Sequence, residues 1–198
     1  PWVNHRADLN YLMDMKGAEI AIGHSYVRGG DMPETPRTTA GLLGADFAVD
    51  NGRYRIKRIY DNESWNPDLR APLAEPGLNV HVGDYIVGVN GRDLAGSDNI
   101  YRLLDGTANV QTVLAVNSRP SADGAHDITV LPVPNEQTLR TRAWVERNRR
   151  IVDSLAAGKL AYVYLPNTGV RGYTRFNRYY LSQQYRKGAI IDERYKGG

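Results

Sequence analysis

A histidine in a glycine-rich turn is the side chain of this sequence with the clearest potential for chemistry. His24 comes just after residues 4–23, a segment of mostly helical pattern, and Gly29 and Gly30 follow it closely. A histidine beyond a helix end can act as a general base, because the ordinary pKa of its ring lies near neutral pH. A histidine on a surface loop gives the same pattern, and the residues alone favour that simpler interpretation.

A second candidate site is the run Gly41-Leu42-Leu43-Gly44. Consecutive backbone N–H groups in such a loop can bind a carboxylate, because glycine has no Cβ to block the inward turn. We expect the amides of Leu42, Leu43 and Gly44 to face the carboxylate, with Leu43 lining an apolar pocket. An ordinary turn is the alternative interpretation of this run.

Composition argues against several other kinds of site. The chain has no cysteine, which excludes disulfides, thiolate zinc sites and a cysteine nucleophile. Its histidines, His5, His24, His81 and His126, include no pair with metal-ligand spacing on one helix face. We therefore predict neither a metal site nor a cofactor.

The charge pattern gives no support for a nucleic-acid partner. The 198 residues include 25 basic and 22 acidic side chains, a formal net charge of +3. The densest basic group lies between Arg140 and Arg150, and we expect it to cover the solvated face of a helix. The side chains expected to turn inward are Leu139, Ala143, Trp144, Ile151, Val152 and Leu155. No apolar run reaches the ~20 residues of a membrane span, so no membrane partner is expected.

The elements that must hold the candidate residues are clearest between residues 71 and 94. Gly77-Leu78 is followed by Val82-Gly83-Asp84, then by the alternating run Tyr85–Val89 and by Asn90-Gly91. Alternation predicts a strand, and Asn-Gly predicts a tight turn because both residues tolerate positive φ. In this order the motifs resemble the middle of a PDZ domain, a small module that binds extended peptide ends.

Further elements fit the same resemblance. Strands are predicted at 53–60, 110–116 and 127–133, and Ser97 is the predicted N-cap of a short helix at 99–104. The resemblance implies that residues 41–44 form the carboxylate-binding loop and that a peptide adds as a strand beside the sheet edge.

The C-terminal third reads as alternating helices and strands. The patterns predict a helix at 136–157, strands at 160–165 and 189–192, and an intervening helix. That helix is expected to bury Tyr173, Phe176, Tyr179 and Tyr180. A parallel pair of strands cannot cover itself, so we interpret this part as the opening of a larger α/β domain.

The motifs of the whole chain resemble, in one fixed order, the C-terminal half of the tricorn proteases, relatives of the C-terminal processing serine peptidases. The order is Asp8–Leu12, Gly23–Asp31, Gly41–Phe47, the PDZ motifs, and Ala189–Gly198. The resemblance implies an α+β fold, with a PDZ-like β-sandwich or partly open barrel and two helices. The predicted domains are a histidine-loop segment (1–39), the PDZ domain (40–134) and a truncated α/β peptidase domain (135–198).

The resemblance also implies roles for single residues. His24 would be the general base, and Gly197 and Gly198 would lie beside the oxyanion-hole glycine. Gly23 stands where the family often has a serine that helps to orient the base, and Lys196 stands where it usually has asparagine. The family's nucleophilic serine and its glutamate come later than Gly198, so we expect this chain alone to hydrolyse nothing.

The implied function is peptide degradation by the full-length protein. The implied partners are peptides or unfolded proteins and further copies of the protein, since family members form hexamers. A cytoplasmic location is expected, with a periplasmic or exported one as the alternative. A stand-alone peptide-binding PDZ module is the alternative function, but it leaves His24 and the C-terminal third unexplained. A trypsin-like peptidase with a PDZ domain would need a two-barrel domain, and no such segment is present.

Overall fold

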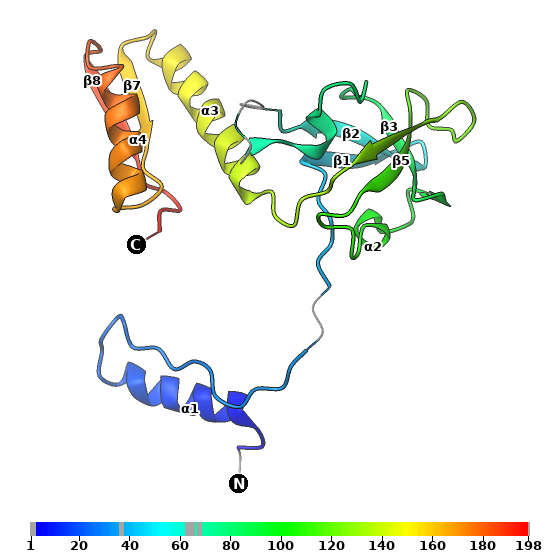
Figure 1. Ribbon diagram of the computed structural model, residues 1–198. Coiled ribbons are helices and arrows are strands. Elements are labelled where there is room, and N and C mark those ends of the chain that lie inside the picture. The colour runs from blue at the N-terminus through cyan, green and yellow to red at the C-terminus, as the bar shows by residue number, and fades with distance from the viewer. Residues whose placement is uncertain (1–2, 36–37, 62–65, 67–68, 198) are drawn as a thin grey trace. The chain divides into compact units, whose positions relative to one another are not determined.

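The computed structural model describes residues 3–35, 38–61, 66 and 69–197. These residues belong to two compact units, Pro1–Thr38 and Thr39–Gly198. The first unit contains helix α1 (Arg6–Ala18), and every other helix and strand described lies in the second (Figure 1). No helix in the described part of the chain is long and apolar enough to cross a membrane.

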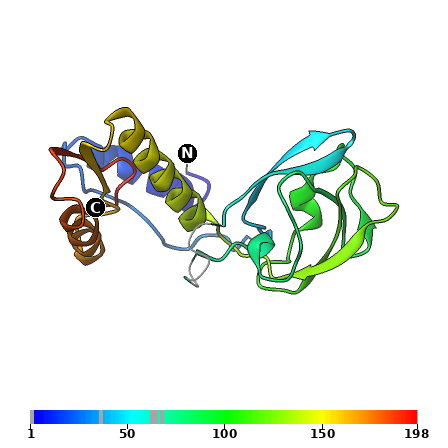
Figure 2. The ribbon, with the colours of Figure 1, turned by 90° about the horizontal axis from the view of Figure 1, so that it is seen from above.

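An open antiparallel sheet is the centre of the second unit. Its strands lie in the order β1-β2-β3-β5-β6, and β4 pairs with β3. The strands are β1 (Ala45–Asp50), β2 (Arg53–Ile59), β3 (Tyr85–Val89), β4 (Arg92–Asp93), β5 (Thr112–Asn117) and β6 (His126–Val130). A 3-10 helix, η2 (Pro72–Ala74), and a short helix, α2 (Ile100–Leu103), lie in its connections. Figure 2 shows the green α2 between the cyan hairpin β1–β2 and the yellow-green β6.

Tight turns fix the register of the sheet. Asn51 and Gly52 join β1 to β2 with φ of 48° and 74°, and Asn90 and Gly91 join β3 to β4 with φ of 49° and 74°. Two residues with positive φ form the turn whose twist matches that of paired strands. The turn predicted at Asn90-Gly91 is therefore confirmed, and it brings Val89 opposite Arg92.

The core of the sheet is made of aliphatic side chains from all of its long strands. Every residue of the central strand β3 is buried, and Ile86 is 0% exposed. Side chains from α2 and the loops complete the core, among them Leu43, Leu94 and Leu104. Removal of this apolar surface from water is the main force that holds the sheet and its loops together.

The chain then passes into alternating helices and strands. These are α3 (Gln137–Leu155), β7 (Leu160–Tyr164), α4 (Val170–Leu181) and β8 (Gly188–Asp192). Strands β7 and β8 pair in parallel from Leu160↔Gly188 to Tyr164↔Asp192, and α4 is the crossover that a parallel connection requires. A small second core joins Val145 of α3 to Tyr162 and Tyr164 of β7.

The predicted α+β class is confirmed by this mixture of helices and strands and by the open antiparallel sheet. The predicted cap of α2 is wrong by two residues, because the side chain of Asn99, not of Ser97, accepts the Tyr101 amide at 3.0 Å. An asparagine there reaches the second helical amide, whereas Ser97 lies too far outside the helix.

Two predicted helix faces also differ from the structure. On α3, Arg142 is buried, whereas Ile151 and Leu155 are 43% and 84% exposed. Arg142 can be buried because Glu146 neutralises it at 2.8 Å. On α4, Tyr173 is 70% exposed, and Gly172 is the buried residue. Two parallel strands offer too little area to cover all the aromatic side chains of α4.

Candidate functional site

His24 lies on a loop that is fastened to α1 at two points. The Val27 amide donates to Asp14 at 3.3 Å, and the Asn10 side chain donates to the Gly29 carbonyl at 2.9 Å. The imidazole of His24 is exposed and meets the Tyr26 ring edge-on, with the ring centres 6.3 Å apart. No hydrogen bond reaches its ring nitrogens from the described residues, so an incoming hydroxyl would have free access to them.

The start of α1 depends on a histidine that sequence analysis did not select. The Nδ1 atom of His5 accepts the Ala7 amide at 3.2 Å, and Asp8 accepts the amide of His5 at 3.3 Å. This reciprocal pair satisfies amides that have no partner within the helix. His5 therefore has a structural role as the N-cap of α1.

Gly197 lies at the carboxyl end of the parallel strand pair. Its amide donates to the Pro166 carbonyl at 2.9 Å, and it forms a parallel bridge with Asn167. Gly198 lies outside the described residues. His24 and Gly197 belong to different compact units.

The Gly41–Gly44 loop lies at the start of β1, as expected, but most of its amides already have acceptors. The amide of Gly41 donates to Leu104 and that of Leu42 to Val133, both at 2.8 Å. The amide of Gly44 donates at 2.9 Å to the side-chain carboxylate of Glu136. Leu43 is 2% exposed and packs in the main core.

The guanidinium of Arg140 joins α3 to the start of β1. It donates to Asp46 at 2.7 Å, to the Tyr60 hydroxyl at 2.8 Å and to Glu136 at 2.8 Å. Burial opposes ionisation of Asp46, but hydrogen bonds from Arg140 and Tyr60 outweigh it and lower the pKa of that carboxyl. One cation therefore neutralises two carboxylates that come from separate elements. No local sequence pattern predicts this cluster, because its members are far apart in the chain.

A groove of about 600 Å³ runs between the edge strand β1 and α2. Its lining residues are Asp46, Phe47, Tyr54, Lys57, Arg58, Asn99, Ile100 and Tyr101. An edge strand carries backbone groups that can pair with an added strand, and a mixed apolar and basic lining suits a peptide. The groove opens beside the strand that follows the Gly41–Gly44 loop.

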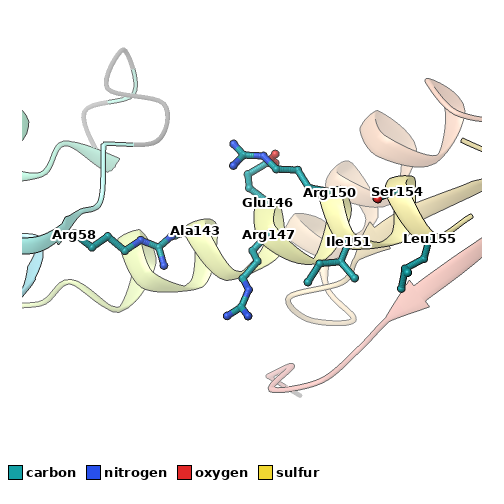
Figure 3. Close-up of a pocket in the computed structure, with 8 residues that line it drawn as sticks. All are labelled: Arg58, Ala143, Glu146, Arg147, Arg150, Ile151, Ser154 and Leu155. Carbon is teal, nitrogen blue, oxygen red and sulfur yellow. The ribbon is translucent and has the colours of Figure 1, made fainter. Parts of the chain in front are cut away.

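A second groove of about 430 Å³ lies along α3, where Arg58 reaches from the antiparallel sheet toward Ala143 (Figure 3). It also contains Ser154, between Arg150 and Leu155. No histidine is among the described residues that line it, so nothing there would activate Ser154 as a nucleophile. This groove does not substitute for a serine peptidase site.

A charged hydrogen-bond network lies at the end of β8. Arg194 donates to Asp192 through its Nη2 at 2.5 Å and its Nε at 2.9 Å, and the Tyr162 hydroxyl donates to Asp192 at 2.6 Å. The hydrogen bonds from Arg194 have the largest effect on Asp192. With the bond from Tyr162, they lower the pKa of Asp192 to about 2 despite burial. Burial and the hydrogen bond that the Tyr162 hydroxyl donates to Asp192 raise the pKa of Tyr162 to about 12. The network fixes the strand end that leads to Gly197.

Replacing Asp192 should test this network. Its pKa is lower in the folded chain, so its stabilisation is complete above about pH 4 and is lost as the pH falls toward 2. We expect Asp192→Asn to lower the free energy of unfolding by about 2 kcal/mol at pH 7 and by less than about 1 kcal/mol at pH 2.5. Urea unfolding followed by tryptophan fluorescence, to which Trp144 beside Arg194 contributes, measures both losses.

Asp153→Asn is the matched control for that substitution. Asp153 also pairs with an arginine, Arg186, at 2.6 Å, but its side chain is 50% exposed. An exposed ion pair contributes less than about 1 kcal/mol. An Asp192→Asn effect that is equally small, or that is the same at both pH values, would contradict a stabilising buried carboxylate.

The chain is similar in sequence to a known protein family and to several of its members. The family profile "Tricorn protease PDZ domain" matches residues 41–135. A tricorn protease of Thermoplasma volcanium is 29% identical over 193 residues, which are 98% of this chain and 18% of that protein. A tricorn protease homolog of Saccharolobus solfataricus is 33% identical over 199 residues, which are 99% of this chain and 18% of that protein.

A solved structure agrees with these sequence matches. The crystal structure of the tricorn protease superposes with a TM-score of 0.86 at 26% identity, covering 99% of this chain and 19% of that one. The similarity thus extends over both compact units and is not confined to the open sheet. The chain spans less than a fifth of the length of each of these relatives.

Proposed function

Because residues 41–135 are a PDZ domain of the tricorn type and the whole chain is related to a segment of tricorn proteases, we propose that it serves in a serine peptidase that degrades peptides. The observation that carries this proposal is the match of 99% of the chain to the tricorn protease structure. A stand-alone PDZ module would account for the open sheet only, not for α1 or the parallel pair β7–β8.

In this proposal His24 is the general base of the intact protease. Its exposed ring, on a loop fastened to α1, can accept a proton from a serine hydroxyl. Gly197 and Gly198 would adjoin the oxyanion hole, at the end of the strand that the Asp192 network fixes. Substitution of His24 in the intact protease tests the hydrolytic part of the proposal.

The substrates we propose are peptides or unfolded proteins, processed by a homo-oligomer in the cytoplasm. The PDZ domain would bind or gate these peptides. An extended peptide would pair with β1 and place its side chains in the groove against Ile100 and Tyr101 of α2. Its terminal carboxylate would lie at residues 41–44, and Lys57 and Arg58 would favour an anionic end.

Amidation of the peptide C-terminus should separate recognition of the carboxylate from simple pairing with a strand. We expect the chain to bind peptides with a free C-terminal carboxylate at least about tenfold more tightly than their amides, because amide N–H groups recognise the charge. Calorimetric titration of a panel of six-residue peptides ending in Leu, Val, Ala or Phe measures both forms. Equal affinities of acid and amide would leave gating as the role of the PDZ domain.

A further inference from the structure

We propose that Glu136 is an internal occupant of the carboxylate site at residues 41–44, which a peptide must displace in order to bind. This inference rests on the proposed function, because it concerns the regulation of the same peptide site. The incoming group is the C-terminal carboxylate of an extended peptide. Its displacement of Glu136 would release α3 from the PDZ loop.

The carboxylate of Glu136 is in the place expected of a ligand. Its side chain is 9% exposed and accepts the Gly44 amide at 2.9 Å. Arg140, four residues further on, neutralises the buried charge with bonds of 2.8 and 2.5 Å. A buried carboxylate needs such partners to remain ionised. Glu136 thus supplies an anion to the loop, and Arg140 supplies the countercharge.

This contact is not the ordinary capping of a helix. Glu136 directly precedes α3, yet its side chain makes no hydrogen bond to the amides of its own helix. Asn135 performs that task instead, by accepting the Gln137 amide at 2.7 Å. The carboxylate of Glu136 therefore accepts hydrogen bonds from a loop of the PDZ domain and from the side chain of Arg140, not from the amides of its own helix.

The loop retains one amide for an incoming ligand. No acceptor within the described residues receives the amide of Leu43, while the amides on either side of it, of Leu42 and Gly44, are engaged. A peptide carboxylate could bind Leu43 with one oxygen and would compete with Glu136 for Gly44. Two carboxylates on neighbouring amides repel one another, so Glu136 must leave or the peptide binds weakly.

Departure of Glu136 would change the contacts that α3 makes through Arg140. The same guanidinium holds Asp46 of β1 and the Tyr60 hydroxyl. Without Glu136, this cation keeps its contacts with the peptide-pairing strand and loses its contact with the helix start. Further along, α3 packs Trp144 and Val145 against β7, so a change at its first turn reaches the strand pair.

Substitution of Glu136 tests the proposal. Glu136→Gln keeps the shape and can still accept the Gly44 amide, but it removes the charge that opposes a second carboxylate. We expect the chain carrying Glu136→Gln to bind the free-acid peptides of the panel about tenfold more tightly, because the binding-competent state is more populated. Binding of the amidated peptides should stay unchanged. In the unsubstituted chain, saturation with acid peptide should move the ¹⁵N resonance of Gly44.

Glu146→Gln is the matched control. Glu146 lies on the same helix, is similarly buried at 13% exposure and pairs with Arg142 and Arg149, but it does not touch the loop. It should leave the affinities for both peptide forms unchanged. Near-ultraviolet circular dichroism of each variant checks that the fold is kept.

The outcomes separate this proposal from the peptide-binding function on which it rests. Acid-selective binding that Glu136→Gln leaves unaltered, or weakens, would overturn the displacement and make Glu136 a fixed link between loop and helix. Failure of every peptide to bind both the unsubstituted chain and the Glu136→Gln variant would overturn carboxylate recognition itself, and the displacement with it.

Discussion

In the full-length protein, replacing His24, the proposed general base, by alanine is expected to lower kcat by at least about 10²–10⁴-fold, the usual contribution of such a base. The loss is greater where the base acts as a unit with its nucleophile. Folding should be unaffected, because the ring is exposed and its contact among the described residues is the edge-on approach to Tyr26. Steady-state kinetics with a fluorogenic peptide should show the loss in kcat, with KM little changed.

His126→Ala is the control for that measurement. His126 is an exposed histidine on β6, remote in sequence from the loop that carries His24, and the proposed function gives it no role. Its loss should leave turnover unchanged. Near-normal turnover of His24→Ala would mean that His24 is a surface-loop histidine and that the assignment of the base is wrong.

The local elements of this chain could be predicted from the sequence because their signals are local. Alternation in residues 53–60 predicted β2, and Asn90-Gly91 predicted the turn after β3. Helix α3 and strands β7 and β8 agree with the predicted segments to within a few residues. Each of these patterns reflects contacts between neighbours along the chain, which is the information that periodicity contains.

Pairing between distant charges could not be predicted in the same way. Arg142 was assigned to a solvated face because an isolated arginine is costly to bury, but Glu146 removes that cost. Glu136 and Arg140 carry no local sign of their contacts with Gly44 and Asp46. The loop was correctly placed at the start of β1, whereas the acceptor of its Gly44 amide is a side chain ninety-two positions later.

Gly44→Ala should be among the most destabilising single substitutions in the PDZ domain. Gly44 has φ of +67°, and an added Cβ would lie 2.6 Å from the Cβ and 3.0 Å from the Cα of Ala71. A left-handed conformation costs a residue other than glycine about 1–2 kcal/mol, and overpacking adds about 1–3 kcal/mol. Together they should lower the free energy of unfolding by about 3 kcal/mol.

Gly52→Ala separates these two costs, because it shares the backbone strain without the collision. Gly52 has φ of +74°, and nothing lies within 4 Å of the Cβ it would gain. Urea titration followed by resonances of β3 and β5 should therefore show a loss of about 1–2 kcal/mol for Gly52→Ala. Equal losses for both variants would mean that the loop moves freely away from Ala71. A larger loss at Gly44 would show that glycine is needed there for packing, so weaker peptide binding by a Gly44 variant reports on the fold as well as on the carboxylate site.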